Sequence, residues 1–276
     1  MGINIWYLTV ENKATDIEIL IKTTIEGSVR SFFLNKQVKT THVLDKIFPK
    51  ERRIRSLIGG LETSFGSRVW EPLAKAFAKQ NGFEILNEKE FNNTLIPQTI
   101  PPEIALCYEK WRTKRELTKN TSLDGYIEEL KGLIKTTDLT EVKYGKGTKG
   151  KGVDIWIKKD GHEYIYDIKT NQINAGDGNK FNGHIMLWYL YRLIKEPECN
   201  ITCQIAFPFN PHNTNFWKKE GGKASPLIPS VDAVVEGEFW NFLLGEEDSW
   251  QKILSTFAKL GEENFGDNFS DIFKSN

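Results

Sequence analysis

Hydrophobic residues recur at helical spacing through the first part of the chain. This spacing covers residues 13–40 and then residues 61–78, with a helix stop expected at the Asn-Gly pair of residues 81–82. The glycine pair at residues 59–60 is expected to interrupt the pattern between the two helices. Pro72 lies inside the second pattern, so we expect that helix to start or bend there. The first part of the chain is therefore predicted to be helical.

Residues 91–102 contain three prolines and are predicted to form a loop. Helical spacing returns over residues 105–117 and 124–134, and again from about residue 181 to residue 194. The last of these helices follows a segment rich in glycine and asparagine at residues 174–182. These patterns add three helices to the prediction.

The second part of the chain also contains short β-branched and aromatic runs. Residues 153–157 and 164–169 are two such runs, and the Asp160-Gly161 pair between them is typical of a β-hairpin. Residues 201–207 form a further apolar strand, which is closed by prolines. We therefore predict one α/β domain with a central mixed β-sheet flanked by helices and with a helical N-terminal region.

Composition narrows the class of protein. The chain has 276 residues, of which 39% are hydrophobic and 27% charged, and no apolar run is long enough to span a membrane. The N-terminus lacks the features of a secretory signal, so we expect a soluble cytoplasmic protein. Three cysteines, Cys107, Cys199 and Cys203, are too few for a disulfide framework and are expected to be buried small hydrophobic residues.

Charge is balanced overall but unevenly distributed. Lysine plus arginine and aspartate plus glutamate each total 37, yet residues 232–276 contain ten acidic and three basic residues. Residues 1–231 therefore carry the matching basic excess. Such asymmetry fits nucleic-acid binding by one face of the molecule, although a solvated surface also produces it.

Two acids and a lysine interrupt the apolar runs of the predicted hairpin. Asp167 and Lys169 are two residues apart and project from the same face of a strand, and Asp154 on the adjoining strand can reach the same place. Two carboxylates beside a lysine repel each other unless a cation neutralises them, and oxygen ligands of this kind suit Mg²⁺. Such a site fits phosphodiester hydrolysis. Alternatively, Asp167 and Lys169 are a solvent-facing pair and Asp154 caps a turn.

The spacing of Asp154, Asp167 and Lys169 resembles the PD-(D/E)xK nuclease signature, with Val153 where proline is common. The surrounding sequence is similar to the TdeIII family of type II restriction endonucleases over residues 61–245. The segments that carry this similarity are residues 61–66, 70–71, 167–170, Asn174, Lys180, 206–211 and 237–240.

The resemblance implies a homodimer that cleaves double-stranded DNA at a short palindrome of the GGNCC type, with Mg²⁺ as cofactor and a DNA methyltransferase as functional partner. It implies 5′-phosphate and 3′-hydroxyl ends. Asp154 and Asp167 match the metal-binding acids, Lys169 matches the catalytic lysine, and Glu71 matches the helix acid that completes the metal shell. Glu62 is the alternative to Glu71. The single nuclease domain then divides into a helical part at residues 1–58, a catalytic core at residues 59–245 and an acidic helical tail at residues 246–276.

Further residues are candidates for binding DNA. Lysines in a glycine-rich loop could contact phosphates, and amide side chains with a lysine after the second hairpin strand could read base edges. These candidates are Lys146, Lys149, Lys151, Asn174, Asn179, Lys180 and Asn182. Residues 210–215 form another polar loop after a strand, where binding residues often gather. His184 is interpreted as a packed residue rather than a general base.

Two other functions remain open on the sequence. A repair or recombination nuclease with the same core would cut branched or single-stranded DNA without a defined site. A DNA-binding protein that kept the fold but lost catalysis would bind without a metal, and its function would survive Asp167→Ala.

Overall fold

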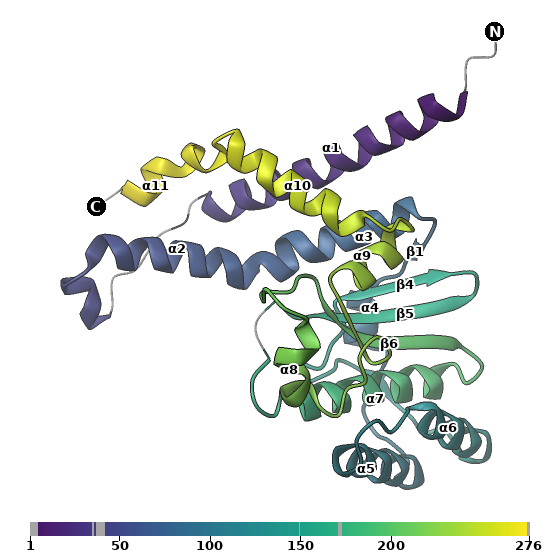
Figure 1. The fold of residues 1–276 in the computed structure, drawn as a ribbon. Helices are drawn as coiled ribbons and strands as arrows, with labels where there is room; N and C mark the ends of the chain where they lie inside the picture. Colours follow the sequence, from purple (N-terminus) through teal and green to yellow (C-terminus); the bar gives the residue numbers. More distant parts are fainter. Residues whose placement is uncertain (1–4, 35, 37–41, 149, 171–172, 275–276) are drawn as a thin grey trace.

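The computed structural model describes residues 5–34, 36, 42–148, 150–170 and 173–274. Helices dominate both ends of the chain, and the sheet lies between them (Figure 1). The helices are α1 (Ile5–Phe33), α2 (Pro49–Phe65), α3 (Glu71–Gln80), α4 (Glu88–Thr94), α5 (Pro102–Leu117), α6 (Asp124–Thr136), α7 (Asp177–Lys195), α8 (Phe216–Ala224), α9 (Gly237–Leu244), α10 (Ser249–Glu262) and α11 (Ser270–Lys274). Shorter helical turns are η1 (Val43–Lys46), η2 (Gly66–Trp70) and η3 (Phe265–Phe269).

The main sheet has five strands in the order β1-β4-β5-β6-β7. The pairs β1–β4 and β4–β5 are antiparallel, whereas β5–β6 and β6–β7 are parallel, so the sheet is mixed as predicted. Its strands are β1 (Glu84–Ile85), β4 (Ile155–Lys159), β5 (His162–Ile168), β6 (Asn200–Phe207) and β7 (Ala233–Val235). A separate ladder pairs β2 (Ile96–Pro97) with β3 (Tyr144–Gly145). The α/β class with a mixed sheet flanked by helices is therefore confirmed.

The hairpin between β4 and β5 forms where the sequence predicted it. Asp160 and Gly161 have φ angles of 50° and 79°, so both turn residues are left-handed, as a type I′ turn requires. Lys159 and His162 face each other across the turn. This register fixes which residues are opposite one another farther along the hairpin.

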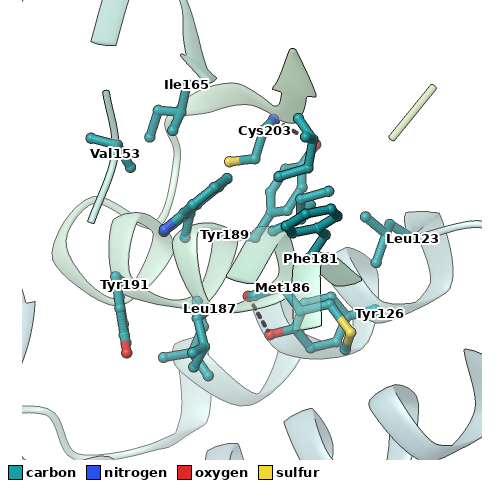
Figure 2. Close-up of a cluster of buried hydrophobic side chains, with 14 of the residues drawn as sticks. Leu123, Tyr126, Val153, Ile165, Phe181, Met186, Leu187, Tyr189, Tyr191 and Cys203 are labelled. Carbon is teal, nitrogen blue, oxygen red and sulfur yellow. Dashed lines mark hydrogen bonds between the residues drawn. The ribbon is translucent and has the colours of Figure 1, made fainter. Parts of the chain in front are cut away.

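Each face of the sheet covers its own hydrophobic core. Trp156 and Ile165 lie on the face that is covered by α7, and α5 and α6 pack on α7 in turn. Figure 2 shows α7 in this core, where the Tyr126 hydroxyl of α6 donates to Met186 O and the Cys203 amide donates to the Tyr189 hydroxyl. The three cysteines are buried and free, as predicted.

The opposite face of the sheet packs under helices from both ends of the chain. Ile157 and Tyr166 lie in this second core with residues of α1, α3, α9 and α10. Ion pairs join α1 to α10: Lys22 Nζ lies 2.6 Å from Glu263 and Lys259 Nζ lies 2.8 Å from Glu18. The acidic C-terminal segment is therefore packed on the helical N-terminal segment (Figure 1). The proposed division at residues 58 and 245 stays a prediction.

Two predicted boundaries were wrong. The helix α2 continues through the glycine pair at residues 59–60, because a Cβ at Gly60 would lie only 3.2 Å from the Phe32 ring. Glycine there permits close packing of α1 against α2 rather than a break. Part of the loop predicted at 91–102 belongs to α4, β2 and α5 instead. 

Other boundaries differ less. The helix predicted over 13–40 ends at Phe33, and residues 35 and 37–41 lie outside the described part. The helix α3 begins at Glu71 with Pro72 in its first turn and ends beside Gly82 at φ 80°, in agreement with the sequence. No helix in the described ranges combines the length and apolar character needed to cross a membrane.

Candidate active site

The two aspartates of the hairpin lie across from each other. Asp154 immediately precedes β4, whose first residue Ile155 pairs with Tyr166, and the Asp154 amide donates to Tyr166 O at 2.9 Å. Asp167 lies on the face of Trp156 and Ile165, because it alternates with Ile165 along β5 and Ile165 pairs with Trp156. The Asp154 carboxyl is within hydrogen-bonding reach of Asp167 and also accepts the Ile168 amide at 2.8 Å. These contacts of the Asp154 carboxyl therefore bring the two carboxyl groups together.

Lys169 follows β5 and lies on the same side as Asp167. Its ammonium donates to Asp167 and lies 5.7 Å from the centre of the Phe181 ring. Its backbone amide donates to Ala206 O at 2.9 Å, which fixes the end of β5 beside β6. The side chain is 31% exposed, so the ammonium can be reached from solvent.

The negative charge of the two aspartates is only partly balanced by nearby positive charge. Asp167 is 6% exposed, and burial together with the neighbouring Asp154 raises its pKa to about 7, against the opposing effect of Lys169. A carboxyl in this setting retains a proton that a bound cation would displace. The electrostatics therefore favour a positively charged ligand at this place.

Glu71 approaches the same end of the hairpin from the other face of the sheet. The turn η2 directs the chain into α3 here, and a Cβ at Gly66 would lie 3.4 Å from the Thr170 side chain. Burial and then the charge of Asp154 raise the pKa of Glu71 to about 7, while Lys169 acts in the opposite direction. Glu62 is exposed on α2 and lines a cavity beside Thr170. The electrostatic interaction with Asp154 favours Glu71 over Glu62.

The donor set fits a hard divalent cation held by two carboxylates. In the described part of the chain, no three His, Cys, Asp or Glu side chains are arranged to hold one metal ion together. Mg²⁺ needs only one or two protein carboxylates, since water and phosphate oxygens complete its octahedral shell. Asp154 and Asp167 satisfy that requirement without Glu71.

The glycine-rich loop before β4 is held by one asparagine that the sequence did not single out. The Asn92 side chain accepts the Val153 amide at 2.8 Å and donates to Val153 O at 2.9 Å. A Cβ at Gly152 would lie 2.7 Å from its oxygen, so glycine is required there. Asn92 thus fixes the backbone immediately before Asp154. The glycine at 152 was the only sequence signal for this contact.

Lysines gather near the carboxylates. His184 is 6% exposed, and burial followed by the charges of Lys169, Lys180 and Lys151 lowers its pKa to about 4. The imidazole is therefore neutral and packed, as interpreted from the sequence. Lys146 and Lys151 are exposed in their loop, whereas Lys149 lies outside the described residues. The lysines that act on His184 form a local positive field.

The residues predicted to read bases after β5 divide into two groups. Asn174, Asn179 and Lys180 are exposed, the last two in the first turn of α7. Asn182 is fully buried and accepts a hydrogen bond from Arg115 Nε at 2.7 Å. The DNA-binding role predicted for Asn182 is therefore wrong, because α7 begins four residues earlier than predicted and turns this amide into the core.

Comparison with known proteins identifies the family of the chain. The family model described as "Type II restriction endonuclease, HinfI" matches residues 13–261. The type II restriction enzyme MjaII of Methanocaldococcus jannaschii is 22% identical over 222 residues, which cover 77% of this chain. The chain spans 56% of that relative's length. No solved structure matches significantly. The match over most of its length places the chain in the HinfI family of type II restriction endonucleases.

Proposed function

We propose that this protein is a Mg²⁺-dependent restriction endonuclease that cleaves double-stranded DNA at a short palindromic site. The observation that carries the proposal is the meeting of Asp154 and Asp167 beside Lys169, in a chain of the HinfI family. The core is proposed to be of the PD-(D/E)xK type. The catalytic residues are Asp154, Asp167 and Lys169, with Glu71 in support.

The reaction is hydrolysis of a DNA phosphodiester. The oxygen of water forms a bond to phosphorus, and the bond from phosphorus to O3′ breaks. The phosphate therefore stays on O5′ of the downstream nucleotide, and O3′ of the upstream nucleotide takes up a proton. Asp154 and Asp167 would hold Mg²⁺, which when bound acidifies water and offsets the charge that develops on the phosphate oxygens. Lys169, fixed by Asp167, positions or deprotonates the attacking water. Glu71 would orient groups at the same edge.

Cleavage of both strands at a palindrome requires two sites related by two-fold symmetry. We therefore propose a homodimer, in which each subunit presents the same surface to one half-site. The GGNCC-type target rests on the resemblance to TdeIII, and the HinfI match leaves the base sequence to experiment. A DNA methyltransferase of the same specificity would protect the host's own sites.

The decisive experiment incubates purified protein with plasmid DNA and Mg²⁺. Discrete fragments with 5′-phosphate ends are expected, and mapping those ends gives the target sequence and the stagger. Random degradation, or cutting confined to branched or single-stranded DNA, would support a repair nuclease instead. Absence of cleavage with metal-independent binding would leave only a DNA-binding protein.

Variants test the roles of the residues. Asp154→Ala, Asp167→Ala and Lys169→Ala are expected to abolish cleavage, while each still binds the target duplex in Ca²⁺. A Lys169→Ala protein with full activity would remove this lysine from the mechanism.

A further inference from the structure

A polar loop and helix next to the proposed site have no role in hydrolysis. The segment runs from Asn210 through α8 and follows β6 directly. It begins beside the site, because Lys169 donates to Ala206 O in β6 and because Thr170, Phe209 and Asn210 line one cavity. The loop therefore leaves the sheet at the edge where Lys169 is fixed.

The exposed side chains of this segment are of the chemical types that can recognise base pairs. Asn213 and Thr214 are exposed, and within the described part of the chain the Asn213 side chain has no hydrogen-bond partner. An amide can make paired hydrogen bonds to a base edge, and a threonine hydroxyl can donate or accept there. Lys218 and Lys219 are exposed in the first turn of α8, without an ion pair among the described residues.

The acidic lining distinguishes base reading from phosphate binding. Asn213 and Thr214 share a cavity with Glu236, whose backbone amide donates to Phe207 O at 2.8 Å. A carboxylate repels phosphate but accepts the exocyclic amino group of a base. Amide, hydroxyl and carboxylate groups together suit base edges, with the two lysines placed to contact the flanking backbone.

A buried ion pair holds the loop in one conformation. His212 Nε2 lies 2.8 Å from Glu220 Oε1, and Lys223 Nζ donates to Glu220 Oε2 at 2.9 Å. Glu220 is 2% exposed. Burial tends to raise its pKa, but the hydrogen bonds from Lys223 and His212 lower it, so the carboxylate is ionised. Within the loop, the Asn210 amide donates to Thr214 O at 2.9 Å.

The helix α8 is also locked to the segment that follows β5. A Cβ at Gly178 in the first turn of α7 would lie 2.1 Å from Ser225 O just after α8, so only glycine allows this contact. Asn179 and Lys180 directly follow Gly178 in the same turn and are exposed. The start of α7 is therefore fixed against the end of α8, and the contact of Glu220 with His212 ties the loop before α8 to the same helix. Precise reading of a sequence requires such fixed positions.

We infer that the loop of residues 210–215 reads base edges of the DNA target, with Lys218 and Lys219 in the first turn of α8 on the flanking backbone. This inference rests on the proposed function and names its specificity element. Asn213 and Thr214 are the contacting residues, and Glu220 is a positioning residue that acts through His212.

The test first uses wild-type protein to map the target, and then compares duplexes with the target and with single base-pair changes. Asn213→Ala, Thr214→Val and their combination are measured for kcat/KM on each duplex. The combination is expected to lower kcat/KM on the target about 10- to 100-fold and to reduce discrimination against changed sites. Binding to a random duplex in Ca²⁺ should change less than about threefold, because phosphate contacts remain.

Asn200→Ala is the matched control, since Asn200 is an exposed amide at the opposite end of β6. It should leave both rate and discrimination unchanged. Discrete wild-type fragments with unaltered discrimination in the double variant would overturn this inference and leave the proposed function standing. Failure of the wild type to give discrete fragments would overturn both.

Glu220→Gln tests positioning. Loss of the charge that holds His212 and Lys223 should lower discrimination more than it lowers cleavage of the altered sites. A purely structural role would instead reduce cleavage of all duplexes in proportion to the loss of folded protein, and that result would exclude Glu220 as a positioning residue.

Discussion

The two ends of β5 carry buried carboxylates in opposite electrostatic situations. Glu163 is 2% exposed and accepts two hydrogen bonds from Arg192, each 2.8 Å, and one from Trp156 Nε1 at 2.9 Å. Burial acts to raise its pKa, but these hydrogen bonds outweigh burial and lower it. Glu163 is therefore an ionised and fully compensated structural group.

Asp167, four residues later on the same face, is nearly as buried but lacks such compensation. Its cationic partner is Lys169, and its other close neighbour is the carboxyl of Asp154. Similar burial thus accompanies a lowered pKa at Glu163 and a raised pKa at Asp167. The difference arises because two carboxyl groups share one lysine at the Asp167 end, and such a shortage of positive charge is typical of a ligand site.

The largest effect should come from Asp167→Asn, which keeps the shape of the side chain but removes its charge. Cleavage of target DNA should fall at least about 1000-fold, because the site loses a metal ligand and the anchor of Lys169. Plasmid cleavage under Mg²⁺ measures this loss. Substantial remaining activity would contradict the assignment of Asp167.

The same variant should be more stable than the wild type at neutral and higher pH. A raised folded-state pKa means that the carboxyl group stabilises the fold below about pH 4 and that this stabilisation is lost as the pH rises through about 7. Asp167→Asn should therefore raise the free energy of unfolding by about 1–3 kcal/mol at pH 8. Urea unfolding at two pH values would show whether the gain disappears in acid.

Glu163→Gln should give the opposite pattern and a smaller effect on catalysis. It leaves the buried Arg192 guanidinium with only the exposed Glu196 as its carboxylate partner, which should cost about 3 kcal/mol of stability, while cleavage per folded molecule stays near the wild-type rate. Urea unfolding and active-site titration separate these quantities. Adding Arg192→Met should restore part of the stability. A loss of cleavage in folded Glu163→Gln would contradict the purely structural role of the Glu163 end of β5.

The sequence was sufficient to predict the Asp167 end of β5. The Asp-Gly turn brings the residue before β4, Asp154, to the end of β5 that carries Asp167 and Lys169, and both the turn and the two-residue spacing of Asp167 and Lys169 are local features. The mixed sheet was predicted from the hairpin strands and from the strand at residues 201–207, which follows the helix predicted from about residue 181 to residue 194. Local rules therefore predicted the elements and the convergence of charges.

The rest depended on partners distant in sequence. Nothing near Glu163 shows that Arg192, 29 residues later, will neutralise it. Asn182 was assigned to a loop because the left-handed Gly176 that precedes α7 was not recognised as the helix boundary. The glycine pair at residues 59–60 was interpreted by its flexibility, whereas packing against Phe32 determines its conformation. In each case the prediction used the local propensity of the residues, whereas a contact with a residue distant in sequence determines the structure.

The pH dependence of Mg²⁺ affinity should come from the Asp167 end of β5 and not from Glu163 at the other end. Since the pKa of Asp167 is raised to about 7, metal binding at lower pH must displace a proton. Affinity should increase up to about tenfold per pH unit below pH 7 and level off above it. Calorimetry in buffers of different ionisation enthalpy should detect about one proton released at pH 6. Glu163→Gln should have the same profile, and an affinity independent of pH would contradict the raised pKa.

The smallest predicted effect is a difference in DNA binding between variants of two lysines, one near each end of β5. Lys180 acts on His184 beside the site, whereas Lys158 lies directly across from Glu163 in the hairpin. If DNA lies over the Asp167 end, Lys180→Ala should weaken duplex binding in Ca²⁺ a few-fold and reduce the slope of log K against log salt by about 0.9. Lys158→Ala should change neither quantity, although it removes the same charge. Equal effects of both variants would mean that binding senses net charge alone, and the DNA would then not be localised to the end of β5 where the carboxylates meet.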